Sequence, residues 1–146
     1  MLYAAIAETS KQLVETSARK KKIERLARLL GELAPDERPI AARHLSGDIG
    51  HKLGIGYATV GELHGQITPA PAASLTVLEV DRRFAEIAAL GGAGSGKARR
   101  DAFGAMLAAA TAAEQSFLGA LVVGELRQGA LDSLVVDGIA QAAALA

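Results

Sequence analysis

The sequence contains no cysteine and no tryptophan, and aromatic residues make up only 3% of its 146 positions. Without cysteine the chain forms no disulfide bond and no thiolate metal site, which suits a reducing compartment. With so few aromatic rings the core must be built from aliphatic side chains, and abundant alanine and leucine favour closely packed helices. We therefore expect an all-α fold, in one domain or two small halves.

The chain also lacks net charge, because sixteen basic residues balance sixteen acidic ones. This balance argues against a protein that coats nucleic acid by bulk charge. The charges are nevertheless distributed unevenly: residues 19–28 hold six cations and one anion, whereas residues 101–146 hold one cation and five acids. One basic surface and one acidic surface are expected.

Long hydrophobic runs are absent as well. Neither end of the sequence carries an uncharged apolar stretch long enough to cross a bilayer, and no signal peptide is recognisable. We expect a cytoplasmic protein with no membrane partner.

The most informative segment present is residues 91–98, Gly-Gly-Ala-Gly-Ser-Gly-Lys-Ala, here called the glycine loop. A nucleotide-binding P-loop follows a strand and places Ser or Thr directly after Gly-Lys, whereas position 98 is alanine. The preceding residues 76–90 instead have helical spacing, and Thr76 with Glu79 is typical of a capping box at the helix start. The glycine loop is predicted to join two helices, with a small P-loop nucleotide-binding protein as the alternative.

Helices are predicted along most of the chain, separated by Gly, Pro and Ser. The expected ranges are 2–16, 17–34, 39–45, one helix capped by Thr59 and Glu62, 76–90, 96–110, 111–123 and 130–145. Ser17 is predicted to cap the second of these helices. In the first, four side chains are predicted to face inward: Leu2, Ile6, Leu13 and Val14.

A linker at residues 68–74, rich in Pro, Ala and Ser, divides the chain into halves of about 1–67 and 75–146. A weak repeat at an offset of 73 supports this division. It rests on three identities, which leave open whether the halves arose by duplication: Leu45, Leu53 and Gly56 recur as Leu118, Leu126 and Gly129.

Helices that begin after a glycine turn present unpaired backbone amides with no side chain in the way, which suits a phosphate group. Such starts are predicted after Gly56, Gly96 and Gly129, with Lys97 and Arg127 beside two of them. The simpler interpretation is that these glycines only end or connect helices.

At these positions the sequence resembles the N-terminal DNA-binding domain of ATP-dependent DNA ligases of the bacterial type. The resemblance covers essentially the whole chain and is strongest in the second half. Four blocks there carry it, in matching order and spacing: Phe84 to Ala88, Gly92 to Ser95 with Lys97, Ala110 through Glu114 to Leu118, and Gly124 to Gly129. The first half agrees more loosely, at residues 22–30, 44–46 and 53–56.

The resemblance implies an all-helical domain of two pseudo-symmetric halves that grips nicked double-stranded DNA across the minor groove, through phosphates and without base preference. It implies a nucleoid-associated parent enzyme that uses ATP and Mg²⁺ in DNA replication, repair or recombination. Partner domains would be a nucleotidyltransferase and an OB domain, both later in the parent chain. The implied DNA-binding residues are Ser17, Arg19, Lys20, Lys21, Gly94, Ser95, Gly96, Lys97, Gly124, Arg127 and Gly129.

No catalytic residue, metal or cofactor is expected in this chain itself. Ligases of the family form their nucleotide adduct on the lysine of a K-x-D-G motif, and none of the six lysines is followed by this pattern. The three histidines lack partners with zinc-ligand spacing. Exposed ion pairs are predicted for Arg82 with Glu86 and for Arg99 with Asp101. A helical protein-interaction module that binds no nucleic acid is the third hypothesis.

Overall fold

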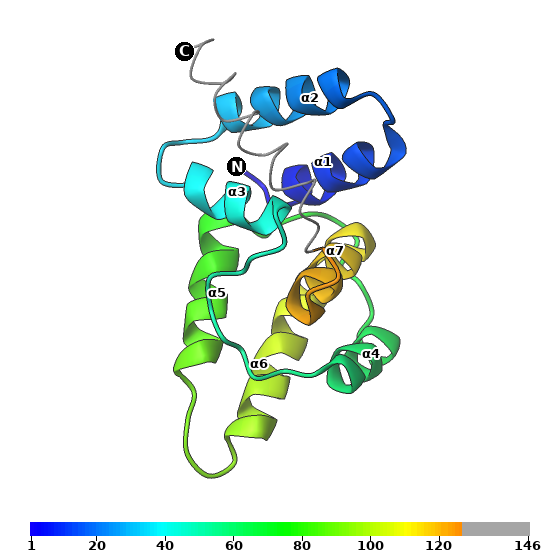
Figure 1. Ribbon diagram of the computed structural model, residues 1–146. Coiled ribbons are helices and arrows are strands. Elements are labelled where there is room, and N and C mark those ends of the chain that lie inside the picture. Colours follow the sequence, from blue (N-terminus) through cyan, green and yellow to red (C-terminus); the bar gives the residue numbers. More distant parts are fainter. Residues whose placement is uncertain (127–146) are drawn as a thin grey trace.

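The computed structural model of the chain describes residues 1–126, and this range folds into seven α-helices (Figure 1). The only β-pairing among these residues is one isolated bridge between Leu2 and Thr76. The predicted all-α fold is confirmed. The predicted helix at 130–145 and the candidates Arg127 and Gly129 lie outside the described residues. In chain order the helices are α1 Ala4–Glu15, α2 Arg19–Glu32, α3 Arg38–Leu45, α4 Tyr57–Gln66, α5 Val77–Ala89, α6 Ser95–Ala108 and α7 Ala112–Val123.

The helices on both sides of the linker pack into one hydrophobic core. Helix α1 packs on α2 and α7, α3 packs on α5, and α4 packs on both α6 and α7. In Figure 1, α2 lies at one end of the molecule and the loop between α5 and α6 lies at the opposite end. The fully buried side chains include Ile6, Leu26, Leu45, Phe84 and Met106, so each side of the linker contributes. Pseudo-symmetry between the halves stays a prediction.

Small residues allow α4 to approach its two neighbours closely. A Cβ atom added to Gly119 of α7 would lie 3.4 Å from Cγ1 of Val60, and one added to Gly104 of α6 would lie 3.6 Å from Cδ2 of Leu63. Both glycines are buried. The scarcity of aromatic rings is thus matched by close contacts between glycine and aliphatic side chains. No helix within residues 1–126 combines the length and apolarity needed to span a membrane.

The start of the chain differs from the prediction. Residues 1–3 are not helical but pair with the segment before α5, because Tyr3 N donates to Leu75 O and Val77 N donates to Met1 O. Tyr3 therefore enters the core, and Leu2 remains 47% exposed. Val14 is 82% exposed, since it sits about 100° around α1 from the buried Leu13. The inward orientation predicted for Leu2 and Val14 was wrong.

Two capping residues were also predicted wrongly, although the predicted helix start after Gly56 is confirmed. The residue before α2 is Ala18, which has an extended backbone and makes no side-chain cap, so Ser17 does not cap this helix. Helix α4 begins at Tyr57 directly after Gly56, which places Thr59 inside its first turn rather than before it. The residue before the helix lies one position from the expected cap in α2 and three positions from it in α4, and neither residue makes a side-chain cap.

The predicted starts of α5 and α7 are supported by the capping side chains. Thr76 accepts a hydrogen bond from Glu79 N at 3.2 Å, although the carboxylate of Glu79 turns to Arg83 instead of completing the box. Thr111 and Glu114 form the full reciprocal box. Residues 68–74 contain no helix, as predicted for the linker.

Candidate nucleic-acid interface

The glycine loop ends in a helix start that is open to an anion. Gly92 and Gly94 have φ angles of +86° and +78°, a left-handed conformation that favours glycine. Gly94 precedes α6 and no side chain caps the helix there. Ser95 N donates to Gly92 O, and Ala98 N donates to Gly94 O. Between them, the amides of Gly96 and Lys97 donate to no acceptor within residues 1–126. These amides and the exposed Lys97 side chain make an anion site physically reasonable.

The surroundings of the glycine loop exclude a P-loop. Helix α5 runs directly into the loop, where a P-loop requires a strand. The P-loop alternative was therefore wrong. Among the described residues no three His, Asp or Glu side chains cluster as a metal site. His44 bonds to the Tyr3 hydroxyl, and His51 bonds to Asp81 at 3.0 Å.

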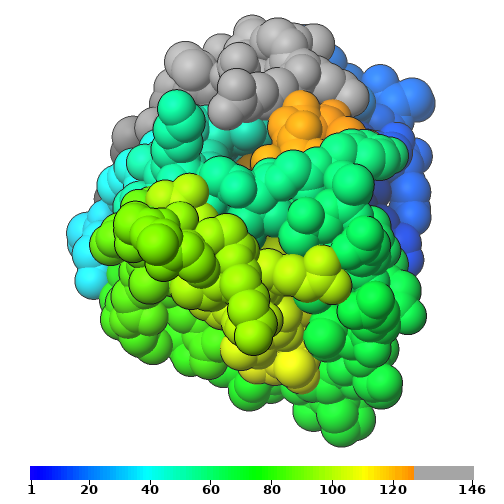
Figure 2. Space-filling model, turned by 90° about the horizontal axis from the view of Figure 1, so that it is seen from below, coloured from blue at the N-terminus to red at the C-terminus, as the bar shows by residue number. Residues whose placement is uncertain are grey.

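A second glycine turn, residues 53–56, lies against Arg99, one helical turn into α6. Gly54 has a φ angle of +67°, and a Cβ atom added there would lie 2.1 Å from Nη1 of Arg99 in α6. Arg99 also donates two hydrogen bonds to the carbonyl of Leu90, which precedes the glycine loop. It therefore does not form the predicted pair with Asp101. In Figure 1 the segment that leads into α4 crosses α6, and Figure 2 shows the molecule from the end that carries the glycine loop.

The helix that follows this second turn also starts without a cap. Gly56 precedes α4, no side chain accepts from its first turn, and that turn contains no acidic residue. Tyr57, the first residue of α4, is 71% exposed. The sequence marked Gly56 as a glycine-preceded helix start but did not place it, or Tyr57, among the binding residues. The sequence signal that could have indicated these residues is a glycine directly before a helix that has no capping side chain.

Helix α7 ends beside α4. Gly124 has a φ angle of +80°, Gly124 N donates to Leu121 O, and Glu125 N donates to Ala120 O. This pair of bonds is a Schellman motif, which explains the glycine as a helix terminator. The amide of Gly124 is thus occupied. A groove of about 360 Å³ between α4 and α7 is lined by Tyr57, His64 and Glu125 among others, so the end of α7 lies near the start of α4.

The third predicted group of binding residues lies elsewhere. Ser17, Arg19, Lys20 and Lys21 are exposed at the start of α2, whose first turn contains no acidic residue. Figure 1 shows α2 at the end of the molecule away from the glycine loop. The structure therefore brings turn 53–56 to α6 and the end of α7 to α4, but it keeps the start of α2 apart.

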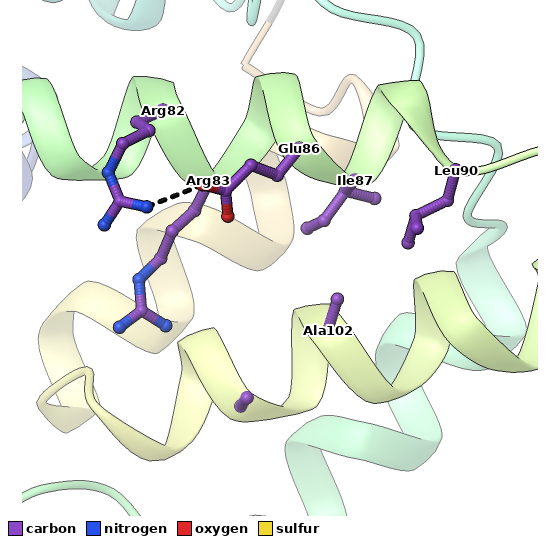
Figure 3. Close-up of a pocket in the computed structure, with 7 residues that line it drawn as sticks. Arg82, Arg83, Glu86, Ile87, Leu90 and Ala102 are labelled. Atoms are coloured by element: carbon purple, nitrogen blue, oxygen red, sulfur yellow. Dashed lines mark hydrogen bonds and ion pairs between the residues drawn. The ribbon is translucent and has the colours of Figure 1, made fainter.

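A further groove, of about 400 Å³, lies between α5 and α6 (Figure 3). Its apolar part includes Ile87, Leu90 and Ala102, and its charged rim includes Arg82 and Arg83. Arg82 pairs with Glu86 at 2.6 Å, as predicted, and Arg83 pairs with Glu79 at 3.2 Å. Since both arginines are already paired with carboxylates, this groove is a poor site for phosphate.

Comparison with known proteins finds similarity to one family. Residues 60–140 match the family model described as DNA ligase N terminus. A probable DNA ligase from Anaeromyxobacter dehalogenans is 49% identical over 150 aligned residues, which cover 99% of this chain and 29% of that protein. Probable DNA ligases from Streptomyces avermitilis and Mycobacterium marinum are 42% and 44% identical, over 97% and 98% of the chain. The chain spans 27% and 28% of the length of these two relatives.

Proposed function

The chain belongs to the DNA ligase N-terminal family, and from this premise we propose that it is the DNA-binding domain of an ATP-dependent DNA ligase. It grips nicked double-stranded DNA through backbone phosphates across the minor groove. The observation that carries the proposal is the adjacency of two glycine turns, each leading into an uncapped helix start, with Lys97 beside one of them.

Each of these starts suits a phosphate oxygen. The amides of Gly96 and Lys97 are unpaired within residues 1–126, and nothing lies within 4 Å of a Cβ atom added at Gly94 or Gly96. In this proposal the two sites, held at a fixed separation, contact two phosphates of the duplex backbone. Contacts with phosphates fix the position of a duplex without identifying its bases. The proposed binding is therefore independent of sequence, and Ser95 is proposed to add a hydroxyl contact.

The start of α2 provides a separate contact in this proposal. Ser17, Arg19, Lys20 and Lys21 present hydroxyl and cationic groups to the same duplex at the other end of the molecule. A domain of 146 residues has a radius of gyration of about 15 Å. A duplex that reaches both ends of a domain of this size therefore needs about one turn of the double helix, because base pairs rise about 3.4 Å each. Arg127 and Gly129, which lie outside the described residues, are proposed as further contacts.

The domain holds DNA and does not seal it. The K-x-D-G lysine is missing from its sequence, so nucleotide transfer with ATP and Mg²⁺ belongs to the nucleotidyltransferase domain of the parent chain. An OB domain is the other proposed partner. With sixteen charges of each sign, the isolated domain binds modestly, and encirclement by the other domains raises the overall affinity through effective concentration.

A salt titration tests the proposal. Binding of a fluorescent nicked duplex is measured between about 50 and about 200 mM salt, since each phosphate contact contributes about 0.9 to the slope of log K against log salt. Lys97→Gln should weaken binding and lower this slope by about 0.9. The control Arg82→Gln removes an arginine already paired with Glu86 and should leave the slope unchanged. A wild-type chain that shows no salt-dependent binding contradicts the proposal and favours a protein-interaction module.

A further inference from the structure

Arg99 contacts both Leu90, the residue before the glycine loop, and Gly54 of the second turn. It lies one helical turn into α6, where Nε and Nη2 donate to the carbonyl of Leu90 at 3.0 and 2.6 Å. These two bonds join α6 to the end of α5 across the base of the glycine loop, and Figure 3 shows Leu90 at that end of α5. The loop is therefore closed by a side chain of the helix that it precedes.

The remaining nitrogen of the same guanidinium faces the second turn. Nη1 of Arg99 occupies the space beside Gly54, at 2.1 Å from the position of an added Cβ. Gly54 is thus required twice, once for its φ angle of +67° and once for the room that it leaves for Arg99. The two turns are about 40 residues apart in sequence, and this contact fixes how far apart they lie in space.

The charge of Arg99 is directed into the protein. No carboxylate of residues 1–126 forms an ion pair with it, and its three guanidinium nitrogens face Leu90 and Gly54. Its neighbour Arg100 reaches the side of α4, where Nη1 lies 2.7 Å from a carboxylate oxygen of Glu62. The two consecutive arginines of α6 therefore hold the helix against the segment and the helix that carry the second phosphate site.

We infer that Arg99 is a positioning residue that sets the separation between the two phosphate-binding turns and does not itself bind DNA. The inference rests on the proposed function and adds a mechanism to it: the spacing of the two sites is built into one forked side chain. A lysine keeps the charge but has a single ammonium group, so it cannot hold Leu90 and Gly54 together. A residue that acted only through its charge would be replaced by lysine without loss.

The test compares Arg99→Lys, Arg99→Gln and Lys97→Gln with the wild-type chain, in the same salt titration on nicked duplex. We expect both Arg99 variants to bind about tenfold more weakly at a fixed salt concentration, because a bidentate charged contact is lost. Their slope of log K against log salt should equal the wild-type slope, whereas Lys97→Gln should lower it by about 0.9. Wild-type affinity in Arg99→Lys combined with a reduced slope in Arg99→Gln makes Arg99 a phosphate ligand and overturns the inference.

A second measurement needs no DNA. It distinguishes a change at the two turns from a loss of affinity that is caused by poor folding. Amide chemical shifts of the free protein are recorded for Arg99→Lys and for the control Arg82→Lys. The inference requires shift changes at residues 53–56 and 91–97 together in a chain that retains its helical circular dichroism. Changes confined to one turn, or spread over the whole core, overturn it. If the wild-type chain itself fails to bind duplex, the proposed function fails while these shifts still test the link between the turns.

Discussion

The hydroxyl of Tyr3 and Nδ1 of His44 lie 2.8 Å apart in the interior of the protein, joined by a hydrogen bond between residues 41 positions apart. Both side chains are fully buried, and the ring of His44 also contacts the ring of Phe84 edge-on. Nε2 of His44 is buried without a hydrogen-bond partner among the described residues. The hydrogen bond ties the segment before α1 to α3, and burial favours the neutral form of the imidazole.

This arrangement predicts acid sensitivity. Burial lowers the pKa of His44 from 6.5 to about 4. The unfolded chain therefore binds one more proton than the folded chain between these values, and the free energy of unfolding falls as pH is lowered through that window. The full contribution, about 3 kcal/mol, is present above pH 6.5 and is lost by about pH 4. Chemical denaturation from pH 7.5 to 4 measures it.

The matched variants are His44→Gln and His64→Gln, since His64 lies exposed in α4. His44→Gln should flatten the dependence of stability on pH above about 5, and His64→Gln should retain the wild-type dependence. A further decline below 4.5 is expected in every variant, because the amino group of Met1 lowers the pKa of Glu37 from that value. An unchanged pH dependence in His44→Gln contradicts the assignment.

Gly96→Ala should separate stability from binding. Nothing lies within 4 Å of the added methyl group, and alanine is the better helix residue, so the free energy of unfolding should rise by up to about 1 kcal/mol. The same methyl group stands in front of the first-turn amides, and affinity for nicked duplex should fall several-fold. Gly31→Ala is the control, because this glycine also has open space around it but lies at the far end of α2. Equal affinity in both variants argues against an anion site at α6.

The length of duplex required tests whether both ends of the molecule bind DNA. Affinity should rise steeply as the duplex is lengthened from about 6 to about 12 base pairs, the span of the domain, and then level off. Lys20→Gln should reduce the gain on the longer duplex. The control Lys11→Gln removes an exposed lysine of α1 that is not a proposed contact. Full affinity on the shorter duplex leaves the start of α2 without a role in binding.

Incubation with labelled ATP and Mg²⁺ should leave no covalent nucleotide on the chain. The reason is the absence of a K-x-D-G motif around any of the six lysines. Denaturing electrophoresis of the labelled mixture, with an intact DNA ligase as the positive control, is the measurement. A labelled band at the size of this chain disproves its proposed non-catalytic role.

Local signals were sufficient to predict several elements. The spacing of Val77, Val80, Phe84 and Ile87 predicted α5, and all four side chains are buried. Thr111 and Glu114 predicted the start of α7 together with its capping box. These predictions succeeded because periodicity and caps involve residues within a few positions of one another. The prediction for Leu2 failed because residues 1–3 pair with residues 75–77, which lie far away in the sequence. Val14 lies on the exposed side of α1, and Ser17 does not cap α2.

The sequence by itself determined the helical class, the glycine-preceded helix starts and the family to which the chain belongs, since all three are encoded in short blocks of residues. Only the tertiary structure decided which of those starts act together. The packing of α4 on α6 brings turn 53–56 to α6 and aims Arg99 inward, while α2 remains at the other end. A contact between residues more than 40 positions apart, such as that of Gly54 with Arg99, arises from packing and leaves no local pattern.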